Sequence, residues 1–236
     1  MSDISWKAEV LLRGDWRAAS SVLLTGASGP ILVDTGMPHD AHQLIRALER
    51  RGLRPEDVHC LINTHFHLDH VSNNCLFHSS VIYATQESYD WGRALYADLV
   101  NETRWQELMM KYYPETYDYE NAGELMGKLR KIALRWWNLS RIGAPAQFRW
   151  IEKHGLPAGI ECLMTCGHVP GHASLIVRNG GGTTVVAGDA LVARAQDAPV
   201  LTMIPHHRAQ HLRDRETILR IHGLIIPGHD GPFTNL

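Results

Sequence analysis

The sequence predicts an α/β fold with two sheets and with helices outside them. Two observations predict it: short apolar strand patterns occur in both halves of the chain, and a helical pattern accompanies the strands in each half. The composition, with 236 residues of which 44% are hydrophobic and 20% charged, is that of a globular chain with ample material for a core. We therefore expect one domain over residues 1–236.

In the first half, three apolar runs are separated by Gly, Asp and Ser, which is typical of consecutive strands. These runs are residues 8–12, 21–24 and 31–34. Pro38 then begins a stretch with apolar residues at helical spacing that ends at Gly52, which predicts a helix. A further strand over 58–62 leads directly to His65, so we expect the histidines that follow to lie on a loop at the end of a buried strand, where active sites are common.

The second half repeats this pattern. We expect strands over 161–164, 174–177 and 184–187, a helix over 209–221 and a last strand over 224–226. Residues 85–153, between the halves, are different, because strand patterns fade and helix formers dominate there. Five of the seven Trp fall in this stretch, which we interpret as a helical, aromatic-rich insertion over the active site.

Histidine clustering indicates the chemistry. His65, His67 and His70, with Asp69, place three imidazoles and a carboxylate within six residues. Neutral imidazole and carboxylate both suit zinc, and a zinc site with three protein ligands keeps a position open for water. Such a group of polar side chains beside a buried strand contributes nothing to the packing of an apolar core. The cluster therefore predicts a metal site.

Three later stretches extend this cluster into a family pattern. They are Cys-Gly-His-Val-Pro-Gly-His at 166–172, Ala-Gly-Asp-Ala at 187–190 and Ile-Pro-Gly-His-Asp at 226–230. With the HxHxDH segment, and in this order, they resemble the metallo-β-lactamase superfamily, as does Val-Asp-Thr-Gly at 33–36. The resemblance covers roughly residues 10–84 and 161–233. It implies an αββα four-layer sandwich with the metals at one edge.

The resemblance also implies a set of metal ligands. One divalent ion would be held by His65, His67 and His168, a second by Asp69, His70 and His229, and Asp189 would bridge them. Zinc is the expected metal, with iron or manganese as alternatives. Of the two histidines in Gly-His-x-x-Gly-His, the first is the ligand in similar proteins, so His172 is expected behind the ligands or near the substrate, or as a structural histidine beside a tight turn. Asp34 matches an aspartate that supports the ligands by hydrogen bonding.

The expected activity is hydrolysis of an acyl bond of a lactone, ester, thioester or amide by a hydroxide that bridges the metals. Asp69 would orient that hydroxide and pass a proton to the leaving group. Lactonases of the family place a tyrosine three residues after the bridging aspartate, where this chain has Val192. The alternatives are a phosphodiesterase or nuclease, an iron-dependent sulfur dioxygenase with one metal, and a non-catalytic metal-binding module.

The aromatic insertion is the clue to substrate and partners. Its aromatic residues are candidate pocket walls that favour a small apolar or aromatic substrate: Trp91, Trp105, Tyr112, Tyr113, Trp136 and Trp137. Alternatively, these rings pack the insertion against the sandwich or form a homodimer interface. We interpret the segment from His206 to Arg208 as a solvated loop.

Charge and apolar patterning disfavour other classes of protein. A net charge of −2 offers no electrostatic footprint for nucleic acid. The N-terminal residues have no apolar core of signal-peptide length, and no window approaches a membrane span, so we expect a cytoplasmic protein with no membrane partner. Four cysteines in a chain of this length make no disulfide framework, and we expect buried free thiols.

Overall fold

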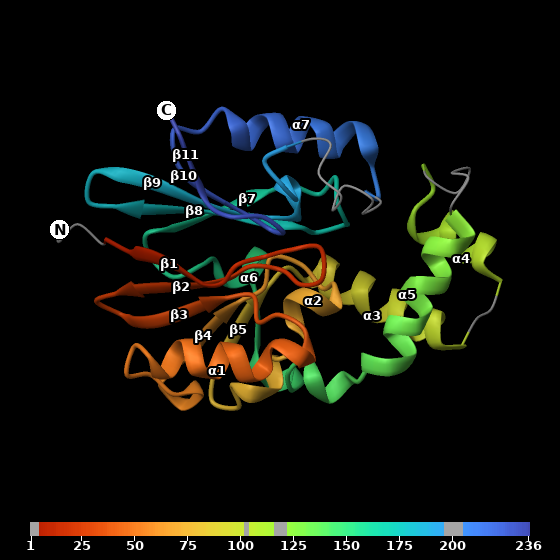
Figure 1. The fold of residues 1–236 in the computed structure, drawn as a ribbon, viewed down its shortest axis with the longest axis horizontal. Coiled ribbons are helices and arrows are strands. Elements are labelled where there is room, and N and C mark those ends of the chain that lie inside the picture. The colour runs from red at the N-terminus through yellow and green to blue at the C-terminus, as the bar shows by residue number, and fades with distance from the viewer. Residues whose placement is uncertain (1–4, 102–103, 116–121, 196–204) are drawn as a thin grey trace.

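The computed structural model describes residues 5–101, 104–115, 122–195 and 205–236, and it shows two sheets stacked between helices (Figure 1). Helix α1 (Ala41–Glu49) covers the outer face of one sheet and α7 (Arg208–Leu219) covers the outer face of the other (Figure 1). This arrangement confirms the expected αββα sandwich. The predicted insertion is described except for residues 102–103 and 116–121.

The first sheet has six strands in the order in which they occur along the chain. They are β1 (Lys7–Leu12), β2 (Ser21–Gly26), β3 (Gly29–Val33), β4 (Cys60–Ile62), β5 (Val81–Ala84) and β6 (Phe148–Trp150). The first three strands are antiparallel, and β3 to β6 run parallel. The carboxyl ends of the parallel strands therefore meet at one edge, which is where ligands bind in open α/β sheets.

The second sheet has five strands in the order β11-β10-β9-β8-β7. They are β7 (Ile160–Met164), β8 (Ala173–Asn179), β9 (Gly182–Gly188), β10 (Gly223–Pro227) and β11 (Phe233–Asn235). Only β9 and β10 are parallel to each other among these neighbours, so their carboxyl ends also lie side by side.

Helix α1 (Ala41–Glu49) forms where Pro38 and Gly52 predict a helix. A turn of 3-10 helix beginning at Pro38 leads into it, and Gly52 follows its end with φ of +71°, a conformation that glycine adopts without a steric cost. Leu44 and Leu48 are fully buried against the first sheet, together with Leu32 of β3. The apolar stripe of α1 therefore faces the sheet.

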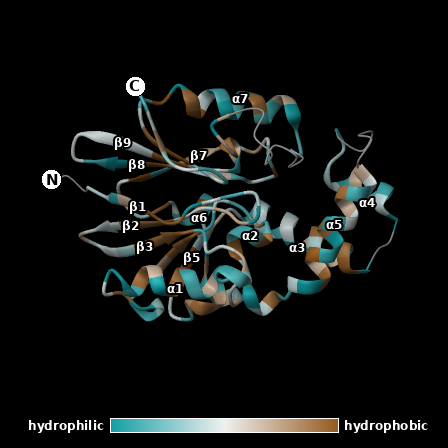
Figure 2. Ribbon diagram, in the orientation of Figure 1, coloured by the Kyte–Doolittle hydropathy of each residue, from teal (hydrophilic) through white to brown (hydrophobic). Residues whose placement is uncertain are grey.

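Two further apolar layers hold the sandwich together. Between the sheets, Val33 of β3 and Ile62 of β4 pack in one cluster with Val186 of β9 and Ile226 of β10. A separate cluster joins the second sheet to Ile218 of α7 (Arg208–Leu219). Figure 2 shows hydrophobic residues along the strands of both sheets. The packing fixes how the loops at the sheet edges face each other.

The insertion has a core of its own, beside the sandwich. It consists mainly of α3 (Gln86–Asn101), α4 (Trp105–Tyr112) and α5 (Ala122–Trp136), which extend to one side (Figure 1). Buried Leu95, Leu99, Leu108, Met109 and Met126 join these helices, and Leu68 of α2 (Leu68–Val71) packs against the same cluster. The cluster thus connects the insertion to the loop that carries the histidines.

The predicted extent of the insertion and the prediction of a last strand need correction. Residues 148–150 are not helical: they form β6 and pair with β5, because Phe148 buries its ring against Phe66 and Tyr89, and the short α6 (Ile151–His154) follows. The prediction that 224–226 is the last strand is wrong, since β11 follows it. Sequence analysis missed β5, β6 and β11, whose three or four residues are too few to show a period.

No helix in the described part of the chain is long and apolar enough to cross a membrane. The cytoplasmic location and the homodimer stay predictions.

Candidate metal centre

Every predicted metal ligand lies on a connection that follows a strand. His65 comes three residues after β4, and the same connection places Asp69 and His70 on α2. His168 lies between β7 and β8, Asp189 follows β9, and His229 follows β10. The parallel pairs β3–β4 and β9–β10 therefore direct their carboxyl ends to the same edge of the sandwich, where these side chains meet.

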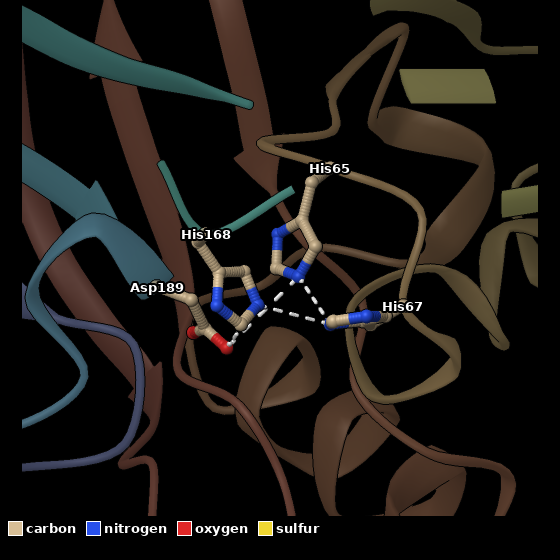
Figure 3. A group of neighbouring side chains, drawn as sticks. All are labelled: His65, His67, His168 and Asp189. Atoms are coloured by element: carbon tan, nitrogen blue, oxygen red, sulfur yellow. Dashed lines mark hydrogen bonds and ion pairs between the residues drawn. The ribbon is translucent and has the colours of Figure 1, made fainter. Parts of the chain in front are cut away.

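The first group consists of His65, His67, His168 and Asp189, all buried (Figure 3). His67 Nδ1 lies 2.9 Å from His65 Nε2 and 3.1 Å from His168 Nε2. Asp189 Oδ2 lies 3.3 Å from His168 Nε2 and 3.9 Å from His65 Nε2. The candidate ligand atoms of this group all lie within 4.8 Å of one another, so one cation could contact them all.

The second group consists of Asp69, His70 and His229. Asp69 Oδ2 lies 3.3 Å from His229 Nε2 and 4.0 Å from His70 Nε2. The side chain of Asp69 keeps 15% of its surface exposed, whereas the side chains of the two histidines are at most 1% exposed. Asp69 is therefore the member of this group with the most access to solvent.

Asp189 lies between the groups. While its Oδ2 faces the first group, its Oδ1 lies 3.3 Å from His70 Nε2 and 3.4 Å from His229 Nε2, in the second group. The carboxylate is fully buried. Each of its two oxygens thus faces a different set of imidazoles, as a bridging ligand requires.

The buried polar atoms of this centre fit a pair of cations. Asp189 Oδ1 and Oδ2, His70 Nε2 and His229 Nε2 have no hydrogen-bond partner in the part of the chain that is described. A buried polar atom without a partner costs free energy, and buried charges in proteins are paired or coordinate metals. Imidazole nitrogens and carboxylate oxygens are donors that Zn²⁺ accepts. These residues could therefore hold two divalent ions.

The electrostatics of the cluster follow from burial and close charges. Burial would raise the pKa of Asp189, but the imidazoles of His229 and His70 outweigh it and hold the pKa well below its usual range. Burial opposes the charged form of His70, yet Asp189, Asp34 and Asp69 raise its pKa to about 10. The carboxylates thus create a strongly negative site that favours bound positive charge.

Outer partners orient the imidazoles. His70 Nδ1 donates to Asp34 Oδ2 at 2.8 Å, and His229 Nδ1 donates to the carbonyl of Asp15 at 2.7 Å. Both rings therefore turn Nε2 toward the centre, and such partners fix the tautomer of a metal-binding histidine. Asp34 has a positive φ of 55°, a conformation that Asp and Asn tolerate better than most residues, and it also accepts from Thr64 N–H at 2.9 Å.

His172 lies behind Asp189. Its Nε2 accepts the backbone N–H of Asp189 at 3.0 Å, and its Nδ1 lies 2.8 Å from Thr165 Oγ1. Burial lowers the pKa of His172 to about 3, so its imidazole is neutral and can accept that bond. Gly188 has φ of +52°, and a Cβ there would meet His172 Nε2 at 2.8 Å. His172 therefore positions the backbone of Asp189, and both of its ring nitrogens have partners within the protein.

Of the predicted pocket residues, the structure brings Trp91 and Tyr113 to the histidines. The Trp91 ring lies 5.6 Å from the His67 ring, and Tyr113 Oη lies 3.3 Å from His67 Nε2. Trp91 Nε1 is buried without a hydrogen-bond partner among the described residues. Val192, where similar lactonases have tyrosine, is buried, and its carbonyl accepts from His229 N–H at 2.8 Å.

The other four predicted pocket residues make contacts within the insertion. Tyr112 Oη donates to Asp98 at 2.6 Å, and Trp137 stacks on Tyr96 with the ring centroids 5.2 Å apart. Trp105 packs beside Gly123 of α5, and the guanidinium of Arg135 lies over Trp136. These four side chains thus hold the insertion together, and their role as pocket walls stays a prediction.

Two features escaped the sequence analysis. The Asp15 carbonyl that orients His229 is a backbone group, for which no residue type gives a signal. The expectation of a solvated loop at His206–Arg208 is confirmed in part, since His207 and Arg208 are exposed and only His206 is half-buried. The contacts that this segment makes were not foreseen: His206 Nδ1 donates to the Tyr112 carbonyl at 2.7 Å, and the Arg208 N–H donates to Glu115 at 2.6 Å. These bonds fasten the end of α4.

A family profile described as "Metallo-beta-lactamase superfamily" matches residues 14–229, which is most of the chain and includes every residue of the two groups. The chain belongs to the metallo-beta-lactamase superfamily. It is a metal-dependent hydrolase of that superfamily, and its two His/Asp groups stand where the metals could bind.

Relatives and solved structures agree with this membership. The chain is 29% identical to a metallo-beta-lactamase domain-containing protein 1 from Xenopus laevis, over 92% of this chain and 73% of the relative. It is 26% identical to an N-acyl homoserine lactonase from Bacillus cereus, over 66% of this chain and 56% of that protein. A metallo-beta-lactamase family protein from Thermus thermophilus has the same fold, with a TM-score of 0.64 at 21% identity, over 97% of this chain and 75% of that one.

Proposed function

We propose that this protein is a binuclear metal-dependent hydrolase that cleaves an acyl bond of a small apolar or aromatic substrate. The observation behind the binuclear assignment is Asp189, whose Oδ2 faces His168 at 3.3 Å and whose Oδ1 faces His70 at 3.3 Å. His65, His67 and His168 would hold one ion with Asp189, and Asp69, His70 and His229 would hold the other. Zinc suits this donor set, and iron or manganese are the alternatives.

When bound, two such ions would activate a water molecule at neutral pH and polarise the bond under attack. The side chains of the protein would transfer the proton. Burial would raise the pKa of Asp69, but His70 and His229 outweigh it and lower the pKa, so its carboxylate is ionised and can accept a proton. Since Asp69 keeps access to solvent, its carboxylate could then pass that proton to the leaving group.

The surroundings of His67 support an apolar substrate. Trp91, which is only partly buried, places an indole ring beside this histidine at the edge of the cluster that joins the insertion to α2. Aromatic rings of this kind commonly line pockets for small molecules. Among the acyl bonds, a lactone is supported by the relationship to the N-acyl homoserine lactonase, although Val192 replaces the tyrosine expected in such enzymes.

The completeness of the second group disfavours two of the alternatives. Asp69, His70 and His229 gather within ligand distance, which a dioxygenase with one iron would not need. A non-catalytic module would tolerate the loss of ligands, and none is lost here. A phosphodiesterase uses the same pair of ions, so substrate tests must separate it from an acyl hydrolase.

Metal analysis followed by a substrate panel tests the proposal. After reconstitution with zinc, plasma mass spectrometry should find about two equivalents per chain. The panel contains lactones, aryl esters, thioesters, β-lactams and bis(p-nitrophenyl) phosphate, each assayed with and without a chelator. We expect metal-dependent turnover of at least one acyl substrate. Fewer than one equivalent of metal would refute the binuclear assignment, and turnover of the phosphodiester alone would refute the acyl assignment.

A further inference from the structure

We propose that Tyr113 is a positioning residue for His67, so that the helical insertion forms part of the outer support of the metal centre. The inference rests on the proposed binuclear site. It adds a residue from outside the four motifs, and it assigns to the insertion a role in holding metal.

His67 presents its two ring nitrogens to different surroundings. Its Nδ1 lies 2.9 Å from His65 Nε2 and 3.1 Å from His168 Nε2, in the middle of the first group, whereas its Nε2 lies 3.3 Å from Tyr113 Oη. A neutral imidazole has one N–H, and a nitrogen that binds a cation must offer its lone pair. The proton therefore belongs on Nε2, from which it is donated to the phenol oxygen.

The sandwich itself supplies the corresponding partner for two other histidines. Asp34 accepts from His70 Nδ1 at 2.8 Å, and the Asp15 carbonyl accepts from His229 Nδ1 at 2.7 Å. His67 differs, because its partner comes from the residue directly after α4. Such partners set the orientation and tautomer of a metal ligand, and their loss typically costs about 10–100-fold in metal affinity.

The segment that carries Tyr113 is held in place on both sides. The carbonyl of the preceding residue, Tyr112, accepts from His206 Nδ1 at 2.7 Å. Two residues further on, Glu115 accepts from the N–H of Arg208 at 2.6 Å and lies 2.8 Å from His207 Nδ1. Tyr113 itself is only 2% exposed. The phenol oxygen is thus presented to His67 by backbone that the second half of the chain fastens.

The neighbouring tyrosine offers a matched control. Tyr112 is also 2% exposed, but its hydroxyl donates to Asp98 at 2.6 Å. Tyr113→Phe and Tyr112→Phe each delete one phenol oxygen from adjacent residues and leave the ring in place. Only Tyr113→Phe removes the acceptor from His67.

The test is a zinc titration of the full-length protein against a chromophoric chelator. We expect the wild type and Tyr112→Phe to bind two ions with the same affinities, and Tyr113→Phe to bind one of the two roughly 10–100-fold more weakly. The visible spectrum of the Co²⁺-loaded protein should change in Tyr113→Phe and not in Tyr112→Phe. Thermal melting of the metal-free proteins controls for folding, since a merely structural role would lower the Tm without changing one site selectively.

Two results would contradict the proposals in different ways. If the wild type binds two ions and Tyr113→Phe binds both with unchanged affinity, or weakens both sites equally, Tyr113 does not position His67. If the wild type itself binds less than one ion, the binuclear site fails, whatever the variants do.

Discussion

Substitution of Gly228 tests the bridging position of Asp189 without replacing any proposed ligand. Gly228 lies between β10 and His229, beneath the carboxylate. A Cβ built at this position would meet Asp189 Oδ1 at 2.1 Å and the carbonyl carbon and oxygen of Gly188 at 3.0 Å. Gly228→Ala therefore pushes the oxygen that faces the second group.

The size of the displacement follows from the contact distance. Ordinary van der Waals contact begins near 3.4 Å, so the carboxylate oxygen must retreat by about 1.3 Å if the backbone stays in place. Proposed metal sites tolerate deviations of about 0.2 Å in ligand distance, and a misplacement of about 1 Å can cost 10²-fold in rate. Because Oδ1 is 3.3–3.4 Å from His70 Nε2 and His229 Nε2, the shift removes it from a shared cation.

We expect Gly228→Ala to lose the second equivalent of metal and to reduce kcat/KM by at least roughly 100-fold on the best acyl substrate. Overpacking should also cost about 1–3 kcal/mol of stability, which corresponds to a fall in Tm of roughly 2–12 °C for a chain of this size. Plasma mass spectrometry, steady-state kinetics and thermal melting measure the three effects.

Gly127→Ala is the matched control. Gly127 lies inside α5, and a Cβ there would meet no atom within 4 Å. Replacing a glycine inside a helix with alanine should stabilise the protein by roughly 0.5–1 kcal/mol and leave metal and activity unchanged. Two bound metals and kcat/KM within threefold of wild type in Gly228→Ala would refute our reasoning on the bridge.

Three further predictions follow from the same geometry. His168→Ala should lose metal and activity together, while His172→Ala should keep most of its metal and lose about 1–3 kcal/mol of stability; the reverse metal contents would show that the wrong histidine was assigned. Asp34→Asn suits the positive φ at this position but removes the charge that faces His70, so zinc competition should show one site weakened roughly 10–100-fold with little change in fold by circular dichroism. Burial raises the pKa of Cys60 to about 12, so its thiolate is scarce at pH 8; iodoacetamide should alkylate Cys60 at least roughly tenfold more slowly than a free thiol by mass spectrometry, without loss of activity.

The sequence by itself determined the fold class and the residues that form the centre. The segment from His65 to His70 places four donors within six residues, so a single loop brings them together whatever the rest of the chain does. The long strands were predictable because each shows an apolar run with turn residues at its ends. The assignment of His168, Asp189 and His229 to the same centre came from the resemblance of their motifs to those of the metallo-β-lactamase superfamily.

Short elements and distant contacts were beyond the sequence. The strand β6 and the pairing of Phe148 with Ile82 depend on where the insertion returns to the sheet. The His206–Arg208 segment looks polar and solvated, yet its partners lie at Tyr112 and Glu115, more than 90 residues away. No local pattern predicts such contacts, because each partner residue, taken alone, is an ordinary residue of a turn or a helix end.

Only the tertiary structure decided how the donors are oriented. Parallel pairing of β9 with β10 puts Asp189 beside His229, and stacking of the two sheets brings both to the loop after β4. The sequence names Tyr113 as one aromatic among many, and the packing of the insertion makes it the partner of His67. The identity of a metal ligand is a property of its side chain, whereas the nitrogen that it presents depends on a hydrogen bond to a residue that the fold brings near.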